Sequence, residues 1–511
     1  MIDVAHLTFQ FDHTDRPALD DISLHVEAGE FVVLTGPSGC GKSTLALALG
    51  GYLFRQFAGR AEGTVWVAGI DVRRSAVYDV AEVVGLVQQN PENQFCTLTV
   101  ADEVAFGLEN RCLPPAEIVE RVDWALGVVG ARHLAHRLLS TLSGGEKQKV
   151  AIAAMMAAHP RVLIFDEPTS NLDPTATAAV FEAIARIRRQ QAIVDKLTVI
   201  VIEHKVRYLR QLALGESADK VHPFVPRIVG MDAGRIVSDG EGGMASCPRL
   251  KSPLRTRLVV ATSVASSPLR IGEGEMAISV RDLCVCYEDG VLVLRNVTVD
   301  IPHGQFVAVM GDNGVGKSTF LHCLLGLAKP TSGTVTVLGL DTRRTPVSEL
   351  ARRVGFLFQN PDHQIFAETV WKEATFATHN FGLGARYDAL SAALLERSGL
   401  GEYLDRHPYR LSYGQKRRLN LISVLPFAEV LLLDEVLIGQ DAENVAALMG
   451  QLRDAADSGV TVVSVTHHPE STWRYADRVL FFAAGGPIVD APPREAFAQL
   501  AERGYTAYTL V

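Results

Sequence analysis

The sequence predicts an α/β fold that occurs twice, as two tandem domains with mainly parallel core sheets. Its 511 residues are too many for one hydrophobic core and suit two domains. A set of motifs occurs twice in the same order, which indicates duplication of one domain. In each copy a short apolar run leads into a glycine-rich turn and then a helical pattern, the order strand, loop, helix.

The repeat is visible in the motifs and in their spacing. Gly36–Thr44 reads GPSGCGKST and returns as GDNGVGKST at Gly311–Thr319, while QNPENQ at Gln89–Gln94 returns as QNPDHQ at Gln359–Gln364. Matched residues keep a nearly constant separation along the chain. We therefore predict domains at 1–240 and 276–511, joined by a flexible linker at 241–275 that is rich in Gly, Ser, Pro and Arg.

Short apolar runs predict the buried strands of these sheets, because parallel strands are covered on both faces. Helical periodicity begins at Lys42 and again at Lys317. The predicted strands are 31–34, 162–165 and 199–202 in the first half, and 306–310, 430–433 and 462–465 in the second.

Composition excludes several classes of protein. The net charge of −9 disfavours a nucleic-acid-binding role, so no nucleic-acid partner is expected. Seven scattered cysteines form no CxxC pair and are expected to be reduced. The N-terminus lacks a signal-peptide pattern, and no apolar run reaches the about 18 residues that span a bilayer. We expect any membrane role to come through a partner.

The two glycine-rich loops match GxxxxGK[ST], a cradle for phosphates. Backbone N–H groups surround the phosphates, the lysine reaches the terminal ones and the serine helps hold Mg²⁺. A chance glycine-rich turn is the alternative, but both copies lie between a predicted strand and a predicted helix. The candidates are Gly36, Gly39, Gly41, Lys42, Ser43 and Thr44, and Gly311, Gly314, Gly316, Lys317, Ser318 and Thr319.

An Asp-Glu pair ends one apolar strand in each half, at Asp166-Glu167 and Asp434-Glu435. A carboxylate at the end of a buried strand needs a cation or metal, and Mg²⁺ is the natural partner. The following glutamate is placed to orient or deprotonate an attacking water. The alternative is an acidic pair that begins a helix.

Leu142–Gln148 reads LSGGEKQ and resembles the signature of the ATP-binding-cassette (ABC) family. This resemblance implies two P-loop NTPase domains, each with an antiparallel β subdomain and a helical subdomain, that bind ATP and Mg²⁺. In that family the domains face each other, and each ATP lies between one phosphate loop and the other domain's signature. One chain would then build both sites, with Ser143, Gly145, Ser412 and Gly414 as signature contacts.

The same resemblance implies roles for further matched residues. Gln89 and Gln359 would sense Mg²⁺, so the implied metal set is Ser43, Gln89, Asp166, Ser318, Gln359 and Asp434. Catalytic roles fall to Glu167 and Glu435 and to the switch histidines His204 and His467. Phe11 and Tyr287 stand where the family stacks adenine, with core packing as the alternative. Asp173 and Asp441 match the family's inter-domain aspartate.

The second half departs from the family pattern. Its signature reads LSYGQ, with Tyr413 in place of the first glycine, and VLIGQD follows Glu435 where PTSNLD follows Glu167. Ser412, Gly414 and His467 remain. We expect two hydrolytic sites of unequal rate, and the site of Lys42, which would use the Tyr413 signature, is expected to be slower.

The stretch after each glutamine resembles the ATPases of energy-coupling-factor transporters, including the cobalt and nickel type. It reads NPxxQ in both halves, followed by LTVADEVAFGLEN at 98–110 and more loosely by ETVWKEATF at 368–376. The resemblance implies docking of a transmembrane coupling protein, a separate substrate-binding membrane protein and a place at the cytoplasmic face of the membrane. An amphipathic helix that only covers its own domain is the alternative for this stretch.

Three other classes of protein compete with this interpretation. A tandem ATPase of a sugar-type importer usually has a degraded second phosphate loop, whereas Gly311–Thr319 is intact. A tandem cassette acting on ribosomes would carry a longer, charged, helical linker. A DNA-repair or chromosome ATPase would need a coiled coil or zinc insertions. The cargo stays open among vitamins, their precursors, and cobalt or nickel.

Overall fold

The computed structural model describes residues 1–12, 14, 16–170, 172–189, 197–203, 226–241, 276–287 and 290–510. The chain divides into two compact units, Met1–Ser252 and Pro253–Val511, and each is described by itself. Apart from Glu241, the last residue of a strand, the predicted linker lies outside the described residues, as does His204.

A six-stranded, mainly parallel sheet forms the centre of the first unit. All its neighbouring strands run parallel except β9 and β10, which form an antiparallel edge. The strands predicted from apolar runs are confirmed, and all residues of β3 and β8 are buried. The order is β10 (Arg235–Glu241), β9 (Arg227–Asp232), β3 (Phe31–Thr35), β8 (Thr198–Ile202), β7 (Val162–Asp166) and β6 (Val84–Val87).

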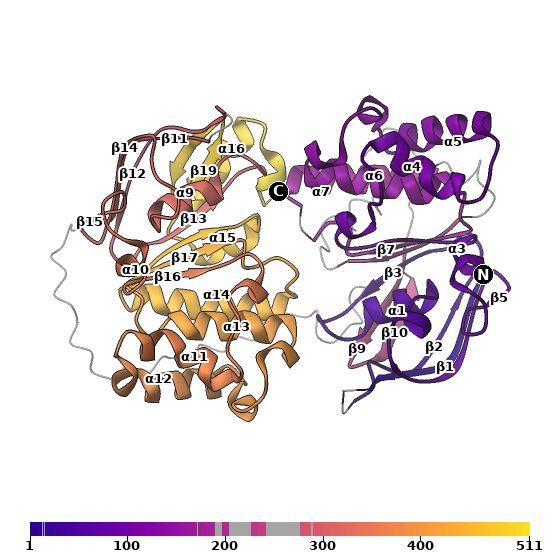
Figure 1. Ribbon diagram of the computed structural model, residues 1–511, viewed down its shortest axis with the longest axis horizontal. Helices are drawn as coiled ribbons and strands as arrows, with labels where there is room; N and C mark the ends of the chain where they lie inside the picture. The colour runs from indigo at the N-terminus through magenta and orange to yellow at the C-terminus, as the bar shows by residue number, and fades with distance from the viewer. Residues whose placement is uncertain are drawn as a thin grey trace. The chain divides into compact units, whose positions relative to one another are not determined.

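One face of this sheet carries an antiparallel sheet with α1 (Lys42–Leu49) packed in the shared core, and the other carries long helices (Figure 1). The antiparallel sheet has the order β2 (Leu19–Val26), β1 (Ile2–Phe11), β4 (Gly59–Val67) and β5 (Ile70–Asp71). The helices of the opposite face are α4 (Val100–Glu109), α5 (Pro115–Val128), α6 (Gly144–Ala157) and α7 (Pro174–Arg189); α2 (Leu53–Gln56) and α3 (Val77–Ala81) are short.

The second unit repeats this plan (Figure 1). Its main sheet has the order β16 (Val354–Leu357), β17 (Val430–Asp434), β18 (Thr461–Val465), β13 (Phe306–Met310), β19 (Arg478–Ala483) and β20 (Gly486–Ala491). Its antiparallel sheet has the order β12 (Leu292–Pro302), β11 (Met276–Cys286), β14 (Ser332–Val337) and β15 (Leu340–Asp341). The helices are α9 (Lys317–Leu324), α10 (Val347–Leu350), α11 (Val370–Asn380), α12 (Gly384–Arg397), α13 (Tyr413–Val424), α14 (Ala442–Asp457), α15 (Pro469–Tyr475) and α16 (Pro493–Glu502).

The sheet order decides where chemistry can occur. In each unit the strand before the glycine-rich loop lies two places from the strand that ends in aspartate, with one parallel strand between them. The carboxyl ends of parallel strands form one edge, which is the usual ligand site of such sheets. Of the helices that the structure describes, none combines the length and apolar character needed to cross a membrane.

Candidate functional site

The glycine-rich loops take a backbone path that only glycine allows. Gly36 and Gly311 have φ angles of 151° and 137°. A Cβ at Gly36 would lie 2.1 Å from the carbonyl oxygen of Met231, and one at Gly311 would lie 2.2 Å from that of Phe482. Each loop is therefore pressed against a neighbouring strand and leads directly into α1 or α9.

A buried lysine follows each loop. Lys42 Nζ donates to the carbonyl oxygens of Gly36 (3.0 Å) and Pro37 (2.9 Å). Lys317 Nζ donates to those of Gly311 (2.9 Å) and Asp312 (2.7 Å). Only 4% of each lysine is exposed, so both ammonium groups face the loop that is predicted to surround a phosphate.

The next residue in each unit meets the strand-ending aspartate. Ser43 Oγ donates to Asp166 Oδ1 (2.9 Å), and Ser318 Oγ donates to Asp434 Oδ1 (3.0 Å). Burial raises the pKa of Asp434 above its usual range, the Ser318 hydrogen bond opposes this, and neighbouring Glu435 raises it further. A divalent cation at this point would favour the charged carboxylate, and a hydroxyl with a carboxylate oxygen is a donor set that suits Mg²⁺.

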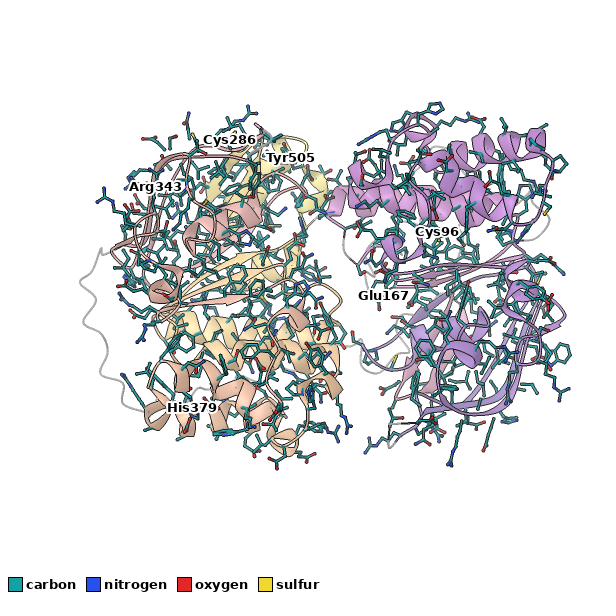
Figure 2. All side chains as sticks on the ribbon, in the orientation of Figure 1. Cys96, Glu167, Cys286, Arg343, His379 and Tyr505 are labelled. Atoms are coloured by element: carbon teal, nitrogen blue, oxygen red, sulfur yellow. The ribbon has the colours of Figure 1, made fainter. Side chains whose placement is uncertain are left out.

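Glu167 and Glu435 directly follow these aspartates, and the backbone leaves the extended strand conformation at each of them. Their φ angles are 46° and 49°, in the left-handed region where residues other than glycine are uncommon. No helix begins at either pair, because α7 starts at Pro174 and α14 at Ala442, so the helix-initiating alternative is wrong. Figure 2 places Glu167 just beyond β7.

Each glutamate is joined to the glutamine of its own unit. Gln89 Nε2 donates to Glu167 Oε2 (3.4 Å), and Gln359 Nε2 donates to Glu435 Oε2 (3.2 Å). In the second unit His467 Nε2 also lies 2.9 Å from Glu435 Oε1. In the second unit the predicted glutamine and histidine therefore both contact the carboxylate of the predicted base, Glu435, beside the Ser318–Asp434 pair.

The signature residues bond within their own helices. Ser143 and Ser412 are the N-caps of α6 and α13, each in a capping box with the residue three positions later. Ser143 N donates to Glu146 (2.8 Å), and Ser412 N donates to Gln415 (2.9 Å). Gly145 and Gly414 lie in the first turn of these helices, where free backbone N–H groups favour an anion.

The aromatic and inter-domain candidates differ in their surroundings. Phe11 packs edge-on against Phe9 and Phe57, with ring centroids 4.9 and 5.8 Å away, which favours the packing alternative. The half-exposed Tyr287 places its hydroxyl 3.0 Å from Thr319 Oγ1, next to the second loop. The predicted inter-domain aspartates accept bonds at helix starts: Asp173 from Ala176 N and Asp441 from Asn444 N.

Sequence patterns did not predict the bonds made by the altered second signature. Tyr413 is turned toward its own glutamine, donating to the Gln359 carbonyl oxygen (3.5 Å). Arg417, which is 1% exposed, donates to Tyr413 Oη (3.0 Å) and to the carbonyl oxygens of Phe358 and Gln359. Burial lowers the pKa of Arg417. Two sequence differences could have indicated these bonds. The second half has Arg417 where the first has Gln148, and Tyr413 where the first has Gly144.

Both halves match known proteins over these motifs. The family model described as "ABC transporter" matches residues 19–170 and 294–437, which include both phosphate loops and both Asp-Glu pairs. The chain belongs to the ABC transporter family. Each unit is an ABC ATPase domain, so the predicted fold class is confirmed and the chain is an ATPase.

Curated relatives match nearly the whole ABC chain. A putative ABC transporter ATP-binding protein of Methanosarcina acetivorans is 34% identical over 98% of this chain and 87% of its own. A putative HMP/thiamine import ATP-binding protein, YkoD of Bacillus subtilis, is 33% identical over 98% and 93%. Among solved structures, cbiO1 from Clostridium perfringens, titled as part of the ABC transporter complex cbiONQ, is 29% identical over 46% of this chain and 96% of its own, with a TM-score of 0.41.

If the second signature completes the site of Lys42, as the family resemblance implies, Tyr413→Gly should raise turnover at that site severalfold, since it restores the Gly-Gly signature sequence of the first half. The variant should be measured in a Lys317→Ala background, so that the steady-state ATPase rate reports the other site. Tyr413→Phe is the matched control, because it loses the bond to Gln359 and keeps the bulk. An unchanged rate in Tyr413→Gly would mean that the tyrosine does not limit this site.

Proposed function

We propose that this chain is the ATP-hydrolysing motor subunit of an importer of the energy-coupling-factor type, acting at the cytoplasmic face of the membrane with separate transmembrane proteins. The observation that carries this proposal is a hydrogen-bonded, partly apolar segment that follows the glutamine loop in both units. The Bacillus subtilis relative, named for HMP/thiamine import, supports a vitamin or vitamin precursor as cargo. Cobalt and nickel remain within the proposed class, because a separate membrane protein would select the cargo.

A buried glutamate fixes this segment in each unit. Glu103 accepts bonds from the backbone N–H groups of Cys96 (2.9 Å) and Thr97 (3.0 Å). Glu373 accepts them from Phe366 (3.0 Å) and Ala367 (2.7 Å), and burial raises its pKa. Charge-assisted bonds of this kind hold the backbone in one conformation. Figure 2 shows Cys96 in this segment of the first unit.

The fixed segments leave large apolar side chains exposed. Leu98 is 77% exposed, and Phe106 on α4 is exposed as well. In the second unit Phe366 and Phe376 are exposed and pack edge-to-face on each other, with centroids 4.4 Å apart. Val100, Val104 and Leu108 of α4 are buried, so core packing explains the apolar residues on that face of the helix. It does not explain the exposed Phe106. Exposed apolar patches favour a partner surface, here the cytoplasmic helices of a coupling protein.

The catalytic residues divide the work of hydrolysis as follows. Glu167 and Glu435 orient a water for in-line attack on the γ-phosphate and accept its proton, while His467 holds Glu435 in place. Lys42, Lys317 and the loop amides bind the phosphates. Ser43, Gln89 and Asp166, and Ser318, Gln359 and Asp434, would hold Mg²⁺, which neutralises phosphate charge when bound.

We further propose that the two domains of one chain pair with each other, each using the other's signature to complete an ATP site. Closure on ATP and reopening after hydrolysis would then be passed to the membrane partner through the segments after Gln89 and Gln359.

Purification of the tagged chain from its host's membranes in mild detergent tests this proposal. Mass spectrometry should recover a polytopic coupling protein and a small substrate-binding membrane protein. Phe106→Asp with Phe376→Asp should lose both partners and keep ATPase activity, whereas Val119→Asp, at an exposed position on α5, should keep them. Recovery of a sugar-type permease would favour the sugar importer, and recovery of ribosomes would contradict the transporter.

A further inference from the structure

The phosphate loop of the second unit contains an acidic residue that the first lacks. Asp312 stands where the first loop has Pro37. A carboxylate turned toward the phosphates within such a loop would repel the ligand, because like charges at close range disfavour binding. The second unit therefore needs a means of keeping this side chain away from the nucleotide.

The C-terminal residues of the unit provide a partner for that carboxylate. After α16 the chain forms a short 3₁₀ turn at Thr506–Tyr508, and the Tyr508 side chain is fully buried. Its hydroxyl donates to Asp312 Oδ1 at 2.8 Å. The tyrosine ring packs edge-on against Phe481, with centroids 4.9 Å apart, in a cluster that also contains Phe497 and Leu500 of α16.

Tyr508 also lies close to the catalytic network. Its ring centroid is 6.4 Å from that of His467, which contacts Glu435. The backbone carbonyl of Asp312 accepts a bond from Lys317 Nζ. Asp312 is thus bonded to the phosphate-loop lysine through its backbone and to Tyr508 through its side chain, so a change at Tyr508 acts directly on the loop.

We propose that Tyr508 is a positioning residue of the second ATP site, which holds the Asp312 carboxylate turned away from the bound phosphates. The inference rests on the assignment of Gly311–Thr319 as a phosphate loop. The competing explanation is that the hydrogen bond only satisfies the buried Tyr508 hydroxyl, because a buried hydroxyl needs an acceptor in any case. The two explanations differ in what removal of the Asp312 charge would do.

The test measures MgATP affinity by calorimetry in a full-length Lys42→Ala background, in which the second site dominates. Tyr508→Phe keeps the ring and its packing and removes only the hydroxyl. We expect MgATP to bind about tenfold more weakly, roughly 1.4 kcal/mol, with a smaller loss at high salt because screening weakens the repulsion. Asp312→Asn added to Tyr508→Phe should restore the affinity of the background protein.

Each alternative outcome overturns the inference. Unchanged affinity in Tyr508→Phe would mean that the hydroxyl does not position the loop. A loss that Asp312→Asn fails to restore would assign the effect to packing. Should Tyr508→Phe melt early, Asp312→Asn alone still decides, because we expect it to bind MgATP at least as tightly as the background and weaker binding would contradict the proposal.

Lys317→Ala, added to Lys42→Ala, separates failure of the proposal for Tyr508 from failure of the phosphate-loop assignment. It should weaken MgATP binding by about 10²-fold or more whatever residue stands at position 508. If the affinity were unchanged, the assignment of Gly311–Thr319 would be wrong, and the role of Tyr508 would be overturned with it.

Discussion

Replacing both Glu167 and Glu435 by glutamine should lower ATP turnover by about 10²- to 10³-fold and leave MgATP binding nearly unchanged. Glutamine keeps the size and the hydrogen-bonding reach of the side chain, but it cannot accept a proton from the attacking water. Because each glutamate contacts the glutamine of its own unit, the substituted amide can still hold that loop. The loss should therefore appear in kcat rather than in affinity.

Steady-state phosphate release and equilibrium MgATP binding, measured on the same preparations, separate these two effects. Glu470→Gln, at an exposed position at the start of α15, is the matched control and should behave as the wild type. The single variants add a comparison between the halves. If the double variant hydrolysed ATP at the wild-type rate, the base would have to be another group.

The parts of the site that sequence predicted are those built from near neighbours in the chain. The phosphate loop needs only a strand, properly spaced glycines and a helix, and the strand-ending aspartates follow from one apolar run. Local geometry of this kind is set by backbone sterics and short-range hydrogen bonds, so residue order is enough to predict it.

The parts that were missed depend on contacts between distant segments. Tyr508 and Asp312 are 196 residues apart, and no periodic pattern connects them. Arg417 donates to the carbonyl oxygen of Gln359, 58 residues earlier in the chain, so its role depends on how α13 packs. The edge-on contact of Phe11 with Phe57, on a neighbouring segment, is likewise not predictable from residue order. Tertiary packing, rather than residue type, settles each of these cases.

Lys42→Ala and Lys317→Ala should each reduce MgATP affinity at their own site by about 10²-fold or more. Each removes a buried ammonium from the centre of a phosphate loop, and loss of one member of a buried charge pair costs roughly 2–5 kcal/mol. The unit should stay folded, since the close approach of the loop glycine to the neighbouring strand is a backbone contact, although the loop loses the lysine's bonds to its carbonyl oxygens. Calorimetric stoichiometry should fall by half in either variant, with the melting temperature as the check on folding.

The residual rates of these two variants then measure the inequality between the sites. In Lys317→Ala only the site of Lys42 can turn over, and we expect it to be the slower one because it would use the signature that contains Tyr413 and Arg417. Those two side chains join α13 to the loop of Gln359, whereas the matched Gln148 makes a single 3.5 Å contact with Gln88. Movement of the second glutamine loop would therefore have to move its signature helix as well. Equal residual rates would mean that this connection does not affect hydrolysis, and loss of all turnover in either variant would mean that the sites act only together.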